Sequence, residues 1–64
     1  MSINILIQIS TPNGPHAFAA HILDRRLTYR ILSTLPGLML ARIYPDDIAA
    51  HAAALALNRA TMEG

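Results

Sequence analysis

The stretch "INILIQI", residues 3–9, decides the fold. Isoleucine occupies every odd position, and the even positions hold Asn4, Leu6 and Gln8. Successive side chains of a strand point to opposite faces and β-branched residues favour strands, so this stretch is predicted to be a β-strand. One of its faces is wholly apolar and belongs to a core. The other face is mixed, and the sequence leaves open what covers it.

The chain carries more apolar surface than one copy of its length can hide. It has 64 residues and is 53% hydrophobic, and its mean hydropathy is +0.36. A domain of about 60 residues buries only about 60% of the surface that its unfolded chain exposes. There is no cysteine, which excludes disulfides and thiolate metal sites. We therefore expect a single domain, residues 1–64, that forms a homodimer or binds another protein.

A membrane location is not expected. Residues 1–23 carry no Asp, Glu, Lys or Arg, but "TPNGP" at 11–15 divides them. Neither half approaches the roughly 20 apolar residues of a spanning helix. The start also lacks the basic residues and the continuous apolar stretch of a secretory signal. We therefore expect a cytoplasmic protein. All five basic residues are arginine, a bias that indicates a GC-rich coding sequence of bacterial or phage origin.

The predicted elements are strand, helix, strand and helix. Residues 10–16 are predicted to form a loop, and a helix is predicted from about residue 15 to residue 34, ended by Pro36-Gly37. Residues 38–44, "LMLARIY", are predicted to form the second strand, and residues 45–60 the second helix. Two aspartates in its first turn, Asp46 and Asp47, lie where the helix dipole favours negative charge.

The predicted fold is α/β or α+β, a small two-layer β-α-β-α unit. A helix between two strands is typical of a parallel crossover. Two strands are too few for an independent sheet, and both would have unpaired edges. We therefore expect the sheet to be completed across a homodimer interface, by edge pairing about a two-fold axis, or by a strand of another protein.

The first predicted helix has two apolar stripes on opposite sides, although one would suffice to cover a sheet. One stripe holds Ala20, Leu23, Leu27 and Ile31. The second stripe contacts either the other helix of the same chain or another subunit. The predicted interface combines the second stripe with the mixed face of the sheet: Phe18, Ile22, Tyr29, Leu32, Leu6, Leu38 and Leu40.

The second predicted helix has a line of small residues beside a larger apolar face. The line either lets another helix approach closely or reflects the high helix propensity of alanine. Its members are Ala49, Ala53, Ala56 and Ala60, and the larger face holds Ile48, Leu55 and Met62.

No catalytic group, metal site or cofactor is predicted. The chain has no HExxH or GxSxG pattern. His16 and His21 are five residues apart, so they would not share a helical face. Arg26 and Arg30 are one helical turn apart and form a candidate anion-binding pair. The alternative for this pair is a solvated helix face.

These observations favour a small non-catalytic binding or regulatory protein, such as an inhibitor or accessory factor, that acts through protein–protein contacts. One alternative is a small oligomeric enzyme with a site at the subunit interface. Such a site would draw on His16, His21, Arg26 or Arg30.

A second alternative is a dimeric DNA-binding regulator. Asn4 and Gln8 alternate along the first strand, which in this respect resembles the reading strand of ribbon-helix-helix repressors. That strand carries no basic residue, however, and Leu6 occupies its central reading position. The net charge of +1 also gives no general attraction to nucleic acid, so a nucleic-acid partner is not expected.

Overall fold

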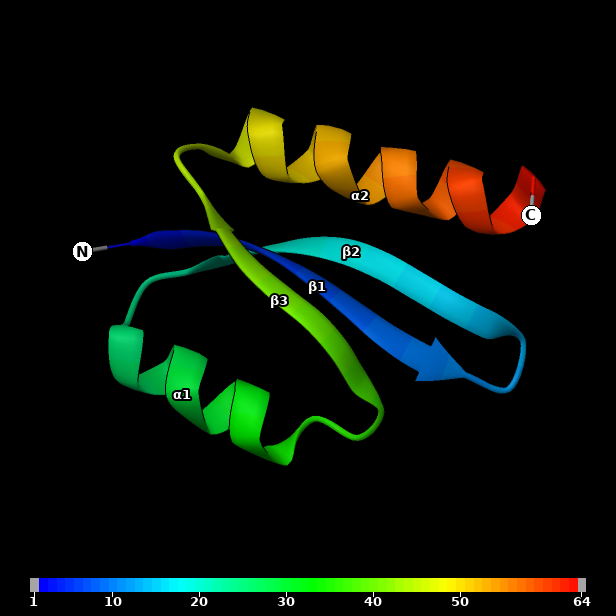
Figure 1. The fold of residues 1–64 in the computed structure, drawn as a ribbon. Coiled ribbons are helices and arrows are strands. Elements are labelled where there is room, and N and C mark those ends of the chain that lie inside the picture. Colours follow the sequence, from blue (N-terminus) through cyan, green and yellow to red (C-terminus); the bar gives the residue numbers. More distant parts are fainter. Residues whose placement is uncertain (1, 64) are drawn as a thin grey trace.

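The computed structural model describes residues 2–63 and shows a three-stranded sheet between two helices (Figure 1). Along the chain the elements are β1 (Ile3–Thr11), β2 (Gly14–Ile22), α1 (Arg25–Thr34), β3 (Leu38–Tyr44) and α2 (Asp47–Glu63). The strand order is β2-β1-β3, and β1 is antiparallel to both neighbours. The fold is therefore of the α+β class, as predicted.

The predicted helix at 15–34 is wrong over its first half, where the chain forms β2. β1 and β2 make a hairpin whose loop is Pro12-Asn13, and Gly14 follows with a φ of 106°. The Thr11 hydroxyl donates to the Gly14 carbonyl at 2.6 Å and accepts the Asn13 N–H at 3.2 Å. Proline and asparagine in the loop, followed by glycine, suit this tight reversal. The two predicted stripes mixed residues of β2 with residues of α1: Phe18, Ala20 and Ile22 all lie on one face of β2, opposite Ile7, Ile5 and Ile3 of β1.

The extra strand also changes how the predicted strands pair. Residues 38–44 do form a strand, but β3 is antiparallel to β1, so the predicted parallel crossover between them is wrong. β2 reverses the chain first, and the connection through α1 then brings β3 to the other side of β1. The β1–β3 register shifts by one residue between Gln8 and Ile9.

Helix α1 starts and ends at local signals. The Asp24 carboxylate accepts the backbone N–H of Arg26 at 2.9 Å and caps the helix start. At the other end, Gly37 adopts a φ of 72°, and its carbonyl accepts the Ser10 N–H at 2.8 Å. A Cβ on Gly37 would lie 2.8 Å from the Ser10 carbonyl oxygen. Only glycine therefore lets β3 begin this close to the end of β1.

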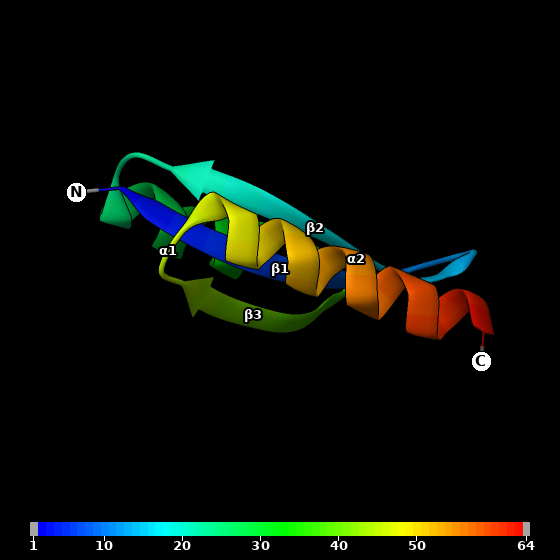
Figure 2. The same cartoon turned by 90° about the horizontal axis from the view of Figure 1, so that it is seen from above.

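Each face of β1 belongs to a separate core. Ile5 and Ile7 pack with Ile22 under α1. Leu6 packs with Ala17 and with Ala54 of α2 on the other face. The two helices therefore cover opposite faces of the sheet, which gives three layers and not the predicted two (Figure 2). The mixed face of "INILIQI" is covered by the chain's own α2.

Helix α2 lies on the sheet mainly through two alanines outside the predicted line, and only Ala49 and Ala53 of that line are half-buried. Its buried residues are Ala50 and Ala54, with Ala53 and Leu57 half-buried beside them. Ala56 and Ala60 are exposed, and so is the predicted larger face of Ile48, Leu55 and Met62. The Asp46 carboxylate accepts the Ala49 N–H at 2.7 Å, so this aspartate caps the helix as well as placing charge there. Within residues 2–63, neither helix combines the length and the apolar character needed to span a bilayer.

Candidate binding site at the edge of the sheet

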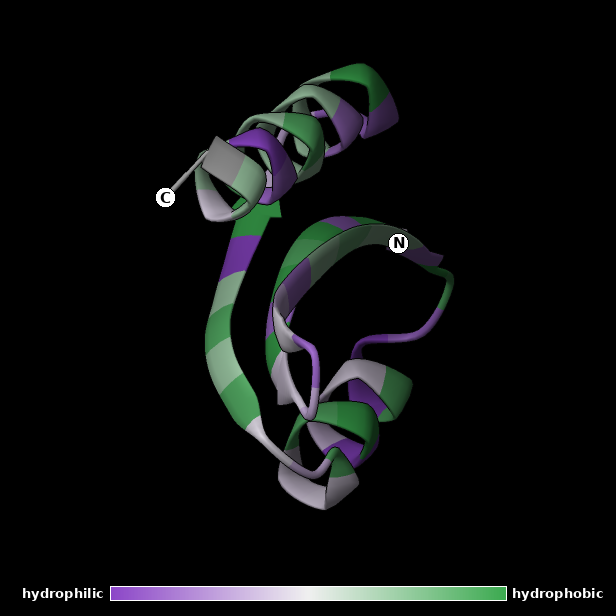
Figure 3. Cartoon of the chain, turned by 90° about the vertical axis from the view of Figure 1, so that its right-hand side faces the viewer, coloured by the Kyte–Doolittle hydropathy of each residue, from purple (hydrophilic) through white to green (hydrophobic). Residues whose placement is uncertain are grey.

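Strand β3 is apolar and lies open on both faces. Every residue from 38 to 43 is exposed, and Ile43 keeps 66% of its surface accessible. The cores under both helices draw on β1 and β2, and α2 touches β3 only marginally. Figure 3 shows β3 at one margin of the molecule, mostly hydrophobic with a single hydrophilic band. The one charged side chain in the strand is Arg42.

The outer backbone of β3 faces away from the sheet. In an antiparallel ladder, successive residues direct their N–H and C=O groups alternately to the two sides. The Ser10 N–H donates to the Gly37 carbonyl, so the even residues of β1 direct their N–H and C=O groups toward β3. These residues pair with the even residues of β3. The groups of Ala41 and Ile43 therefore point outward, and Met39 lies at the register shift between Gln8 and Ile9.

The opposite edge of the sheet is covered by a side chain at one residue. The Asn58 amide of α2 accepts the Ala17 N–H at 2.8 Å and donates to the Ala17 carbonyl at 2.9 Å. On the same side of β2, Pro15 has no N–H to offer. A further strand would have to displace Asn58 to pair there. Within the part of the chain that the structure describes, β3 is thus the sheet edge without such cover.

A pocket of about 340 Å³ adjoins this open strand on the α1 face. Tyr29 and Leu32 of α1 line one side, and Ile43 of β3 lines the other. Tyr29 is 79% exposed although its ring is large and mostly apolar. The pocket continues the apolar surface of β3 on to the helix.

The predicted interface residues fall into two groups. Leu38, Leu40 and Tyr29 are exposed on or beside β3. The others lie in the chain's own cores, so they offer little or no surface to a second chain. Leu6 and Ile22 are fully buried, and Phe18 and Leu32 are half-buried against the isoleucines under α1.

The predicted interface did not include Met39, Ala41 and Ile43, which are exposed on β3. The available signal was the run "LMLARIY" itself, which is too apolar for a protected edge strand. The strand that β3 pairs with could be known only from the register of the sheet.

The two arginines of the candidate anion-binding pair line one shallow pocket of about 260 Å³ on α1. Arg26 and Arg30 share it with Asp24, whose carboxylate is already engaged at the helix start. An anion there would face a carboxylate as well as two guanidinium groups. The geometry therefore adds nothing to the predicted pair.

The histidines do not meet the arginines. His16 and His21 lie on opposite faces of β2, because their partners on β1 are Ile9 and Asn4. His16 stacks on Phe18 with ring centroids 6.3 Å apart. The His21 Nδ1–H donates to the Asn4 amide oxygen at 2.8 Å.

A small pocket of about 120 Å³ contains His21 with Asp47 and His51, and no arginine lines it. Among the residues that the structure describes, no group of three or more His, Cys, Asp or Glu is arranged to hold a metal ion.

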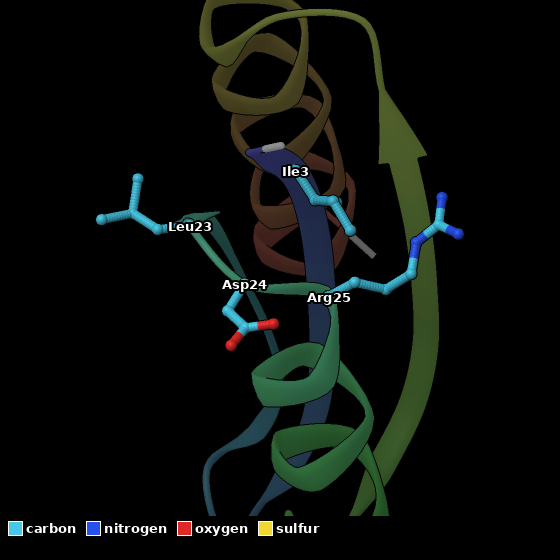
Figure 4. A pocket seen from close by; sticks show the side chains of 4 residues that line it. All are labelled: Ile3, Leu23, Asp24 and Arg25. Atoms are coloured by element: carbon cyan, nitrogen blue, oxygen red, sulfur yellow. The ribbon is translucent and has the colours of Figure 1, made fainter.

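A pocket of about 510 Å³ lies where β2 turns into α1. Ile3, Leu23, Asp24 and Arg25 line it, and the side chains of Leu23 and Arg25 point away from each other (Figure 4). Because its polar groups do not converge on a common point, the pocket gives no arrangement for acid–base or nucleophilic chemistry.

Comparisons with known proteins leave the site to be judged by its own geometry. No protein-family model, curated protein or solved structure matches the chain.

The arrangement of β1 bears on the DNA-binding alternative. This strand is central and paired on both sides, and Asn4 and Gln8 are only half-exposed, so the chain does not present it as a free groove-reading ribbon.

Proposed function

We propose that this chain is a small non-catalytic protein that acts by binding protein through the open edge of β3. One observation carries the proposal: a seven-residue apolar strand is exposed on both faces and along its outer backbone. Natural proteins shorten, charge or cover such edges, because unpaired strands recruit other chains. An uncovered apolar edge therefore supports a pairing role, in which β3 takes up a strand of a second polypeptide chain.

The chemistry of β3 defines what it would bind. Pairing with an added strand gives affinity through main-chain hydrogen bonds, and side chains on the two faces give selectivity. Leu40 lies on the α2 face and Ile43 on the α1 face, so both sides of an added strand would meet apolar surface. Arg42 of the strand and Arg25 of α1, which lines the adjoining pocket, add positive charge. The expected partner segment is therefore extended and largely apolar.

Two matched substitutions test this role. Ile43→Lys places a charge on the open edge, and Ile48→Lys places one on the outer face of α2, where Ile48 is 78% exposed. Each variant and the wild type would be immobilised and exposed to an extract of the source cells, and captured polypeptides would be quantified. Ile43→Lys is expected to capture about tenfold less, because a charge on β3 opposes strand addition, and Ile48→Lys is expected to match the wild type. Equal capture by both variants would contradict the proposal, and far-UV circular dichroism would confirm that both are folded.

A further inference from the structure

We infer that the strand paired with β3 is the β3 of a second copy, arranged antiparallel about a two-fold axis at Ala41. The result is a six-stranded sheet with the order β2-β1-β3-β3-β1-β2. This inference rests on the proposed function of β3 as the binding element, and it names the partner.

The two unlike edges of the sheet favour a closed pair. Asn58 occupies the β2 edge at Ala17, so a strand added along the whole of β2 would have to displace it, whereas β3 is open along its length. Two copies that join through the same edge use up both open edges, and the assembly stops at two. A chain with two open edges would continue into a fibre instead.

The sequence of β3 suits pairing with itself in one register. Ala41 is the middle residue of the seven, so an axis there pairs the whole strand with its copy. It also places the outward backbone groups of the two strands opposite each other. Leu38 then faces Tyr44 of the second copy, Met39 faces Ile43, and Leu40 faces Arg42.

Two neighbouring registers would also place the outward backbone groups opposite each other, but both pair less favourable side chains. A shift one way puts Arg42 directly opposite Arg42 of the second copy, and like charges opposite each other destabilise a sheet. A shift the other way sets Ile43 against Gly37 and Tyr44 against Pro36, outside the strand. The small side chain of Ala41 also leaves room where the two copies meet.

The pocket beside β3 fits this register. Ile43 lines the pocket together with Tyr29 and Leu32. In the inferred pair, Met39 of the second copy lies opposite Ile43 and therefore at the mouth of the pocket. Methionine is flexible and fills irregular apolar gaps. Tyr29, which is exposed in the single chain, would then be covered by Met39 of the second copy.

The surface area agrees with one missing partner. The chain exposes 4759 Å², whereas a folded monomer of its mass is expected to expose about 4,000 Å². The excess is close to the roughly 800 Å² that each partner buries in an interface of standard size. The molecule is also thin, with a smallest extent of 11 Å, and Figure 2 shows that it is narrow across the strands. Edge pairing would extend it in that direction.

Disulfide trapping tests the register, because the wild-type chain has no cysteine. Directly opposed residues of a hydrogen-bonded antiparallel pair have Cα atoms about 5.5 Å apart, which lies within the range that a disulfide spans. Ala41→Cys is expected to become mostly a disulfide-linked dimer under mild oxidation. Ala52→Cys, an exposed alanine on α2, gives the collision background. If Leu40→Cys cross-links more than Ala41→Cys, the axis is misplaced and the inferred register is wrong.

Sedimentation equilibrium tests the partner independently of that disulfide. The wild type and Ile48→Lys are expected to be dimers at micromolar concentration, and Ile43→Lys is expected to dimerise about 100-fold more weakly, because each copy loses buried apolar area. A wild type that stays monomeric at hundreds of micromolar, or an Ile43→Lys variant that remains a dimer, would overturn the inference. In either case, loss of extract capture by Ile43→Lys alone would leave β3 as the binding element with a different partner. Equal capture by both lysine variants would contradict the proposed function itself.

Discussion

The side chain of Asn58 pairs with the backbone of Ala17 as a residue of a fourth strand would. It accepts the Ala17 N–H and donates to the Ala17 carbonyl, at 2.8 and 2.9 Å, across 41 positions of sequence. Ala17 is 3% exposed, so water has little access to these two backbone groups. One amide therefore satisfies a strand edge and anchors the C-terminal half of α2 to the sheet.

Asn58→Ala is expected to lower the free energy of unfolding by about 1–3 kcal/mol, because two buried backbone groups of Ala17 lose their partners. It should also open the β2 edge at Ala17 and cause association beyond the inferred dimer at high protein concentration. Urea denaturation at fixed protein concentration measures the first effect, and light scattering measures the second.

Thr61→Ala is the control for that change. Its hydroxyl only donates to the Leu57 carbonyl within α2, at 3.0 Å, and the residue is exposed. The variant should stay within about 0.5 kcal/mol of the wild type. If Asn58→Ala behaves in the same way, the amide does not close the edge.

Leu6→Ala is expected to cost about 2–5 kcal/mol, since it removes a fully buried side chain and leaves a cavity between β1 and α2. Leu55→Ala makes the same chemical change at a site that is 56% exposed and should cost far less. Urea denaturation of both variants compares them directly. Similar losses would mean that Leu6 is not covered by α2 within one chain.

Gly37→Asn is expected to destabilise the fold by about 1–3 kcal/mol through overpacking, because the new Cβ meets the Ser10 carbonyl. Asparagine tolerates a positive φ better than alanine does, so this change isolates the contact from the backbone conformation. Thermal unfolding of Gly37→Asn against the wild type measures this loss, and an unchanged midpoint would refute the close approach of the two backbones.

Ala50→Leu is expected to cost about 1–3 kcal/mol, because α2 lies too close to the sheet there for a larger side chain. Ala50 is 1% exposed. Ala52→Leu adds the same atoms on an exposed position of the helix and should be nearly neutral. Chemical denaturation of the pair decides the orientation of α2, and a greater loss from Ala52→Leu would mean that the opposite face contacts the sheet.

Much of the fold could be predicted from local patterns. The alternation in "INILIQI" predicted β1, Pro36-Gly37 marked the end of α1, and the aspartates at 46 and 47 marked the start of α2. The class α+β followed from these elements. Each of these signals lies within a few residues of the structure that it predicts.

β2 was mistaken for helix because alanine and a broad apolar distribution suit both structures. The stronger signals were Pro12-Asn13-Gly14, a hairpin sequence, and Asp24, a cap immediately before the real helix. The open edge could not be predicted, since it depends on strand order and on Asn58 reaching Ala17. Both relationships join residues far apart in the sequence.

The central position of β1 has a consequence for biosynthesis. β1 leaves the ribosome before the other elements and can form its hairpin with β2 at once, but its second partner begins at residue 38 and its α2 cover near residue 50. Contacts of such long sequence separation form late and slow folding. During translation, Leu6 therefore stays uncovered on the nascent hairpin until the part of α2 that packs on it, around Ala54, has been made, and that interval is when this protein would most need a chaperone.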